Sequence, residues 1–134
     1  MPFVLDNSVV CGWLFENQAD DYTEAVARRL SSDRAAAPVL WPMELANVLR
    51  TACRRGSLTA QQAQGMLEQL ALLPIGIDPH PARPGLLLAL ALRFDLSACD
   101  ATYLELALRL QQPIATRDAA LADAARAAGV GTVG

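Results

Sequence analysis

Short apolar segments alternate along the chain with longer segments in which apolar residues recur every three or four positions. The short segments have the length of buried strands and end at polar or proline residues. They are residues 3–5, 35–40, 74–78, 113–115 and 130–133. Strands that alternate with helices form parallel sheets through right-handed crossovers. The pattern therefore predicts an α/β fold with a central parallel sheet of about five strands and helices on both faces.

The longer segments have the periodicity of amphipathic helices. Pro42 stands in a first helical turn, which tolerates proline, and Gly129 follows the last helix as a typical C-terminal residue. The predicted helices cover residues 9–15, 20–30, 42–56, 58–70, 86–94, 98–110 and 118–128.

The size and composition indicate one compact domain over residues 1–134. The chain is 53% hydrophobic and 19% charged, which excludes a disordered chain. Its longest strongly apolar run, residues 86–92, is far shorter than the roughly 20 residues of a membrane-spanning helix, and no secretory signal is visible. Three widely spaced cysteines are typical of small buried residues in a reducing compartment. We therefore expect a cytoplasmic protein without membrane contact.

The absence of lysine excludes several kinds of enzyme. All eleven basic residues are arginine, and His80 is the single histidine. P-loop and Schiff-base chemistry need lysine, and HExxH zinc hydrolases need paired histidines. The net charge of −3 has the wrong sign for binding nucleic acid by bulk charge. A nucleic-acid partner would need a local arginine patch or a metal ion.

Four carboxylates occupy equivalent places in the pattern. Each follows a predicted strand or begins a predicted helix, and they are Asp6, Glu44, Asp100 and Asp118. Ligand sites of open parallel sheets lie at the carboxyl ends of the strands, so we expect these side chains to converge on one pocket. Asn47 follows Glu44 by one helical turn and is expected on the same face.

Each acid also has an ordinary structural role open to it. Acids favour the first turn of helices, where they cap free N–H groups, and residues 97–100 fit a capping box. As a group, however, four carboxylates with no lysine among them would repel one another unless a cation neutralised them. Carboxylate oxygens without Cys or His ligands favour Mg²⁺ or Mn²⁺ over zinc. We therefore predict a Mg²⁺ or Mn²⁺ site.

These acids lie in four short motifs that together resemble a known family. The motifs are VLDNS at residues 4–8, PMELANVL at 42–49, SACDATYLELA at 97–107 and ATRD at 115–118. Their order and spacing over nearly the whole chain resemble the PIN domain, and are most similar to VapC-type toxins of bacterial toxin–antitoxin pairs. Cys99 departs from the pattern, because an aromatic residue is more often expected there.

The resemblance implies a three-layer α/β/α fold and a metal-dependent endoribonuclease toxin. Its catalytic and metal-binding acids map onto Asp6, Glu44, Asp100 and Asp118, with Ser8 and Thr116 supplying hydroxyls nearby. In that scheme Asp6 and Asp100 hold Mg²⁺, while Glu44 and Asp118 orient water or hold a second ion. Cleavage would leave a 5′-phosphate and a 3′-hydroxyl.

The resemblance also implies partners. Arg117, beside Asp118, and the group Arg50, Arg54 and Arg55 are candidates for contacting the RNA backbone near the site, unless all of them are ordinary solvated residues. A VapB-type antitoxin would neutralise the toxin, and the predicted helices 9–15 and 58–70 could form the groove that accepts it. We also expect a homodimer with contacts in residues 86–110, although those leucines could equally be core.

Two other functions fit the acids. A PIN-like binding module could keep them as helix caps without catalysis. An Asp-based phosphoryl acceptor, such as a receiver domain or a phosphatase, also places aspartates after parallel strands. The second alternative is weaker, because such proteins normally use a lysine that this chain lacks.

Overall fold

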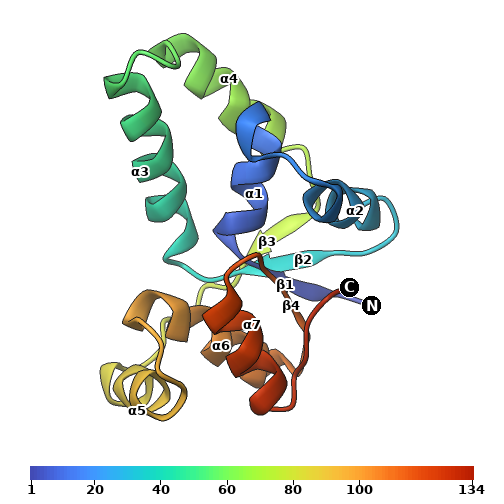
Figure 1. Ribbon diagram of the computed structural model, residues 1–134, viewed down its shortest axis with the longest axis vertical. Helices are drawn as coiled ribbons and strands as arrows, with labels where there is room; N and C mark the ends of the chain where they lie inside the picture. The colour runs from blue at the N-terminus through green and yellow to red at the C-terminus, as the bar shows by residue number, and fades with distance from the viewer.

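The computed structural model describes residues 1–134 as short parallel strands separated by helices (Figure 1). The elements follow the predicted order closely. Their bounds are β1 Phe3–Leu5, α1 Asn7–Leu14, the 3-10 helix η1 Glu16–Gln18, α2 Asp21–Arg29, β2 Ala35–Ala37, α3 Trp41–Arg54, α4 Ala60–Leu70, β3 Ile75–Ile77, α5 Pro84–Phe94, α6 Ala98–Leu110, β4 Ile114–Ala115 and α7 Ala119–Ala127.

The four strands form one parallel sheet in the order β3-β2-β1-β4. From β1 the chain adds β2 and then β3 on one side, and it later returns to place β4 on the other side. The strand order therefore reverses between β1 and β4. In open parallel sheets such a reversal leaves a crevice at the carboxyl ends of the two strands, and ligands bind there.

Helices cover both faces of the sheet, which confirms the predicted three-layer α/β/α arrangement (Figure 1). One apolar core lies between the sheet and the helices α1 to α4, and it includes Phe3, Leu5, Val26 and Leu49. The other lies between the sheet and α5 to α7, and it includes the fully buried Tyr103. Alternate residues of β1 face opposite cores, because successive side chains of a strand point to opposite faces.

The predicted fifth strand at residues 130–133 is wrong, because only one bridge, between Ile114 and Thr132, forms there. Gly129, just before this segment, and Gly131, within it, have φ values of 87° and 76°, which are incompatible with extended strand geometry. The strand predicted at residues 35–40 is also shorter and ends at Ala37. Pro38 follows it and has no N–H to donate to a sheet.

The predicted dimer stretch at residues 86–110 contains two kinds of leucine. Those of α6 are core residues, with Leu104 and Leu106 almost fully buried. Those of α5 include Leu86, Leu88 and Leu92, whose exposed fractions are 47%, 60% and 76%. Of the two helices, only α5 therefore presents large apolar side chains to solvent.

The cysteines are all free, and only Cys11 is buried. The expectation that all three are buried is wrong for Cys99, which is exposed. Cys99 lies in the first turn of α6, ahead of the buried stripe that begins at Ala101.

None of the helices has the length and apolar character needed to cross a lipid bilayer.

Gly12 allows α1 and α2 to approach closely. A Cβ at this position would lie 2.5 Å from Cγ2 of Thr23, which is fully buried. We expect Gly12→Ala to lower the free energy of unfolding by about 1–3 kcal/mol, the usual cost of overpacking, although alanine has the better helix propensity. Chemical denaturation measures the change.

Gly65 of α4 provides the matched control, because a Cβ there meets nothing within 4 Å. Gly65→Ala should stabilise the protein by up to about 1 kcal/mol through helix propensity alone. Equal effects of the two substitutions would contradict the packing argument.

Candidate active site

The crevice between β1 and β4 brings together residues that are about 110 positions apart in the sequence. The backbone N–H of Asp6 donates to the carbonyl oxygen of Ala115 at 3.0 Å, which aligns the ends of the two strands. Asp6 directly follows β1, and Thr116 directly follows β4. The hydroxyl of Thr116 donates to Oδ2 of Asp6 at 2.7 Å. The Thr116 hydroxyl therefore lies beside Asp6, near the site where the family resemblance implies it.

A hydrogen-bond network fixes the orientation of the buried Asp6 carboxylate. Ser8 Oγ donates to the same oxygen, Oδ2, at 2.7 Å. Each hydroxyl in turn accepts a backbone N–H: Ser8 from Arg117 at 2.9 Å and Thr116 from Asp118 at 3.0 Å. Since these N–H groups occupy the hydroxyl oxygens, the hydroxyl protons are directed to Asp6. Oδ1 lies outside this pair of hydroxyl bonds.

Arg117 ties the β4–α7 connection to the first helix. Its Nε and Nη2 donate to the carbonyl oxygen of Ser8 at 2.9 and 2.6 Å, and Nη1 donates to the carbonyl oxygen of Gln18. Nη1 also lies 3.4 Å from a carboxylate oxygen of Asp20. The Arg117 guanidinium therefore already bonds to the backbone around the site. If Arg117 contacts RNA, as predicted, it must give up some of its bonds to the carbonyl oxygens of Ser8 and Gln18.

Glu44 reaches the site from the first turn of α3, where Pro42 starts the helix. The hydroxyl of Tyr103, a fully buried residue of α6, donates to Oε1 of Glu44 at 2.5 Å. This bond joins α3 to the helix that carries Asp100. It connects residues 59 positions apart and fixes one oxygen of the Glu44 carboxylate.

Asp100 and Asp118 lie at the amino ends of two helices. The N–H of Asp100 donates to Ser97 Oγ, the N-cap of α6, at 3.0 Å. Asp118 is itself the N-cap of α7, and its Oδ1 accepts from the N–H of Leu121 at 3.1 Å. Asp118 therefore has the capping role that the sequence left open, whereas at the start of α6 the cap is Ser97 and the Asp100 side chain caps no N–H group. Asp118 keeps its second oxygen, and both oxygens of Asp100 remain outside these bonds.

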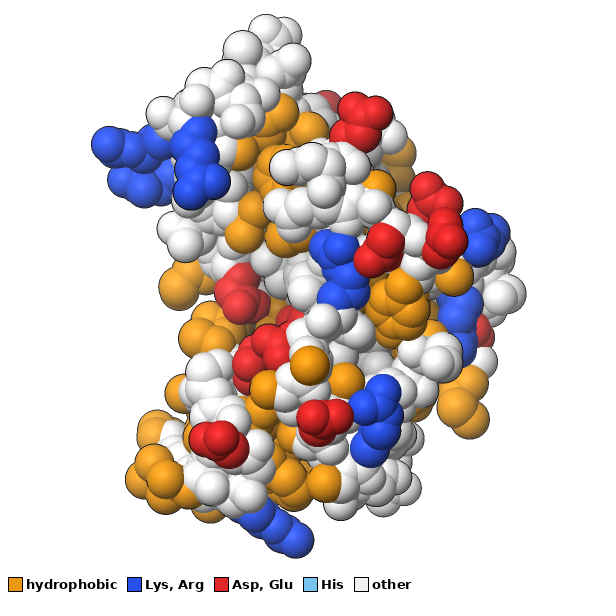
Figure 2. All heavy atoms as spheres, viewed as in Figure 1, with side chains coloured by type: hydrophobic (Ala, Val, Ile, Leu, Met, Phe, Trp, Pro, Cys, Tyr) orange, Lys and Arg blue, Asp and Glu red, His pale blue; other side chains and the backbone are white.

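The four carboxylates interact electrostatically without a compensating cation. Burial raises the pKa of Asp6, and the charge of Asp118 adds to this. Burial also raises the pKa of Asp100, as do the charges of Asp118 and Asp6. Burial raises the pKa of Glu44, with further contributions from Asp6 and Asp100. No ion pair of the protein involves any of the four. Acidic side chains gather in the hollow between α3 and α7 (Figure 2).

The donor set fits a hard divalent cation bound through few protein ligands. No three His, Cys, Asp or Glu side chains stand close enough to form a complete shell. Mg²⁺ does not need one, because it usually keeps several waters and binds through one or two carboxylates. Asp6, with its orientation fixed by hydroxyls, and Asp100, whose charge interacts with those of Asp6 and Asp118, are the carboxylates suited to that role.

Two buried residues that sequence reasoning missed support the site. Trp41 Nε1 donates to Oδ1 of Asn7 at 3.1 Å, and Nδ2 of Asn7 lies 3.8 Å from Cys11 Sγ. Asn7 follows Asp6, and Trp41 begins α3 one turn before Glu44. The bond therefore connects the starts of α1 and α3. By contrast, the predicted supporting residue Asn47 is exposed, and its side chain makes no hydrogen bond.

Removing the Tyr103 hydroxyl should change the titration of Glu44. The hydrogen bond from Tyr103 lowers the pKa of Glu44 and so opposes the effect of burial. We expect Tyr103→Phe to raise that pKa further and to reduce stability by about 1–2 kcal/mol. An NMR titration of the Glu44 carboxyl carbon measures the first effect.

Tyr22→Phe is the matched control, because the Tyr22 hydroxyl bonds to the carbonyl oxygen of Val133 and to none of the acids. An unchanged Glu44 titration in Tyr103→Phe would refute the contact.

Comparison with known proteins places this geometry in a family. The chain resembles the crystal structure of PAE2754 from Pyrobaculum aerophilum with a TM-score of 0.64 and 19% sequence identity, covering 92% of this chain and 79% of that one. At this identity the likeness shows a shared fold. No curated protein matches the chain significantly. The family model of the PIN domain matches residues 3–127. With this match spanning all four strands and all four acids, the chain belongs to the PIN domain family.

Proposed function

We propose that the protein is a metal-dependent endoribonuclease that cleaves RNA phosphodiester bonds. One observation carries the proposal: four carboxylates converge at the switch point of a parallel sheet with no basic side chain to neutralise them. A PIN domain is generally a nuclease-like fold, and the uncompensated charge supports a cation-dependent reaction at this place.

The four carboxylates would have two roles in the reaction, metal binding and orientation of the attacking water. Asp6 and Asp100 would hold Mg²⁺ or Mn²⁺, and the bound ion would supply a water of lowered pKa and polarise the phosphoryl oxygen. Glu44 and Asp118 would orient the attacking water, and the raised pKa of Glu44 makes its carboxylate a better proton acceptor. Attack in line with the leaving 3′-oxygen gives a 5′-phosphate and a 3′-hydroxyl.

A cleavage assay tests the proposal. The purified chain is incubated with a 5′-labelled single-stranded RNA in Mg²⁺, in Mn²⁺ and in EDTA. Internal cleavage should occur in both metal buffers, stop in EDTA and leave 5′-phosphate ends. Failure to cleave any of a pool of random RNAs in either metal would favour the non-catalytic binding module.

A role as the toxin of a toxin–antitoxin pair forms part of the proposal. The toxin would act on cytoplasmic RNA and be held inactive by a VapB-type antitoxin. An apolar cavity of about 480 Å³ supports a peptide-binding role for the groove beside α1 and α4, and Trp13, Leu14 and Met66 are among its lining residues. Expression of the chain alone should stop growth, and an isolated chain that is harmless on expression yet cleaves RNA in vitro would contradict the toxin role.

A homodimer through α5 is also part of the proposal. Leu86, Leu88 and Leu92 are exposed on a helix whose main packing partner is α6, and a second copy could cover them. Light scattering of the purified protein at micromolar concentration should give twice 14.3 kDa. Leu92→Glu should shift the mass to that of the monomer, and a monomeric wild-type protein would refute the dimer.

A further inference from the structure

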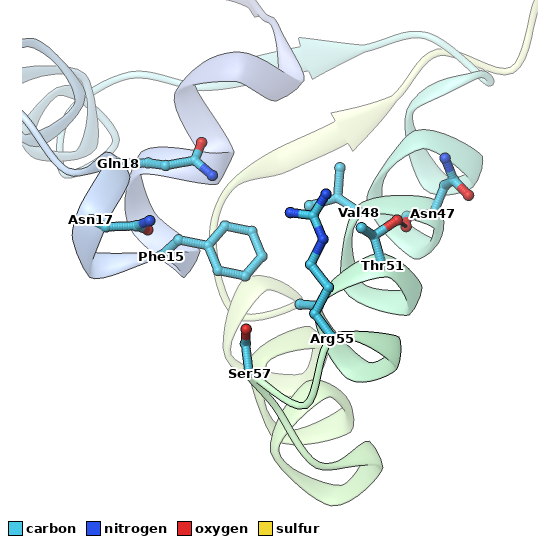
Figure 3. A pocket seen from close by; sticks show the side chains of 9 residues that line it. Phe15, Asn17, Gln18, Asn47, Val48, Thr51, Arg55 and Ser57 are labelled. Carbon is cyan, nitrogen blue, oxygen red and sulfur yellow. Dashed lines mark hydrogen bonds between the residues drawn. The ribbon is translucent and has the colours of Figure 1, made fainter.

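A second cavity, of about 290 Å³, lies between α3 and residues 15–18, which include η1 (Figure 3). The ring of Phe15 and the guanidinium of Arg55 point into it from opposite walls. The residues that line it are Phe15, Asn17, Gln18, Asn47, Val48, Thr51, Ala52, Arg55 and Ser57. Most of them are polar, unlike the residues around the apolar cavity beside α1 and α4.

Most polar side chains of this cavity are not used by the fold, the exception being Thr51, whose hydroxyl donates to the carbonyl oxygen of Asn47 at 3.0 Å. No hydrogen bond joins the side chains that line it, and Arg55 has no acidic partner. Gln18 contributes to the fold through its carbonyl oxygen, which leaves its side-chain amide free. Asn17, Gln18 and Asn47 thus present unpaired amide donors and acceptors beside a half-buried aromatic ring.

Both walls of the cavity lead to the acidic site. On one wall, Asn47 follows Glu44 by three residues of α3, about 4.5 Å along the helix. On the other wall, the carbonyl oxygen of Gln18 accepts a bond from Arg117, the neighbour of Asp118. A ligand that occupied this cavity could therefore extend directly to the carboxylates.

The outer end of α3 carries positive charge although the chain as a whole has a net charge of −3. Arg50, Arg54 and Arg55 lie there, exposed and without ion pairs. Figure 2 shows basic side chains grouped at this end and acidic ones in the hollow beyond it. The charge beside the cavity complements a phosphate backbone and would repel a cationic ligand.

We infer that this cavity binds one unstacked base of a single-stranded RNA whose neighbouring phosphodiester lies at the carboxylates, an inference that rests on the proposed function. Phe15 offers a ring face for stacking, and the amides of Asn17 and Gln18 can hydrogen-bond to the edge of a base. Arg55 can contact the adjacent phosphate. A duplex does not fit this scheme, because its bases are stacked and paired.

Binding of RNA hexamers by the full-length protein tests the inference without using cleavage. Affinity is measured by fluorescence anisotropy in EDTA and in Ca²⁺ for the wild type, Phe15→Leu and Arg55→Gln. Phe15→Leu keeps the apolar volume and removes the aromatic face. We expect each substitution to weaken binding about 5- to 20-fold.

Arg34→Gln is the matched control, since it removes the same charge just before β2, at the amino ends of the strands, whereas the acids lie at the carboxyl ends. It should leave the affinity unchanged. The loss in Arg55→Gln should shrink as salt is raised, whereas the loss in Phe15→Leu should persist, because stacking does not depend on charge.

An abasic scan of the hexamer identifies the bound base. One abasic position should weaken binding to the wild type and have no further effect in Phe15→Leu. The inference would be overturned if no abasic position changed the affinity, if neither substitution weakened binding, or if the wild type bound no hexamer in either buffer. Each of these results would favour a protein segment as the occupant of the cavity. Cleavage in Mg²⁺ is scored separately, so a protein that binds RNA through Phe15 without cleaving it would refute the proposed function and keep the base pocket.

Discussion

Replacing Asp6 or Asp100 with asparagine is expected to lower Mg²⁺-dependent RNA cleavage by about 1,000-fold or more, which is ~4 kcal/mol of barrier. Asparagine keeps the size of the side chain, and its carbonyl oxygen can still accept the hydroxyls that reach Asp6. The charge that would hold the cation is lost in either variant. The assay is cleavage of a labelled RNA under single-turnover conditions.

Both variants should fold normally, and without metal they should be at least as stable as the wild type, because a repelling charge has gone. Asp123→Asn is the matched control, since Asp123 is exposed on α7 and pairs with Arg126 outside the site. It should retain full activity. Full activity in Asp6→Asn and Asp100→Asn would refute the assignment of the ligands.

The stability of the metal-free protein should respond to pH in a direction set by the acidic site. The pKa values of Asp6, Glu44 and Asp100 are raised in the folded protein. In the pH range above their ordinary values the folded state therefore holds more protons than the unfolded state, so these groups reduce stability as pH rises through their folded pKa values.

Divalent metal should reverse that loss. At pH 7 a Mg²⁺ concentration 100 times the dissociation constant adds about 2.7 kcal/mol, or roughly 10 °C in Tm. At pH 4 the gain should disappear, because protons compete for the same carboxylates. The pKa values of Asp20 and Asp33 are lowered by hydrogen bonds and oppose the slope, so the wild type is compared with Asp100→Asn to isolate the site.

Thermal melts over pH 4–8, with and without Mg²⁺, provide the measurement. The Mg²⁺ effect should be absent in Asp100→Asn and intact in Asp123→Asn. A Mg²⁺ gain of equal size at pH 4 and pH 7 would contradict the linkage to these carboxylates.

The alternation of strand and helix patterns predicted the architecture and the edge of the sheet at which the acids lie. Asp6 and Asp118 could be placed because each comes just after a buried strand, and strand ends meet in a parallel sheet, whereas Thr116 was placed only by the family resemblance. The predicted strand at residues 130–133 failed because the backbone conformation of its glycines prevents the extended structure that its valines favour. The valines at residues 130 and 133 resemble a strand, but Gly129 and Gly131 adopt positive φ and leave only one bridge.

The supporting contacts of the site could not be predicted, because they join side chains distant in the sequence. Tyr103 lies in an apolar helix and gave no polar signal, although its hydroxyl positions Glu44. Trp41 and Asn7 are 34 residues apart. The place of Arg117 beside Asp118 makes it a candidate RNA contact, whereas its bonds to two carbonyl oxygens depend on the path of the chain after α1 and could not be predicted.

Paramagnetic Mn²⁺ tests most directly where a divalent cation binds. Substoichiometric Mn²⁺ is titrated into ¹⁵N-labelled protein while amide signals are followed by NMR. We predict that the signals of residues around Asp6, Asp100 and Asp118 broaden first and recover when excess Mg²⁺ is added. Broadening centred instead on the exposed acids around Asp20 and Asp21, or no broadening at the β1–β4 crevice, would contradict binding at the four carboxylates.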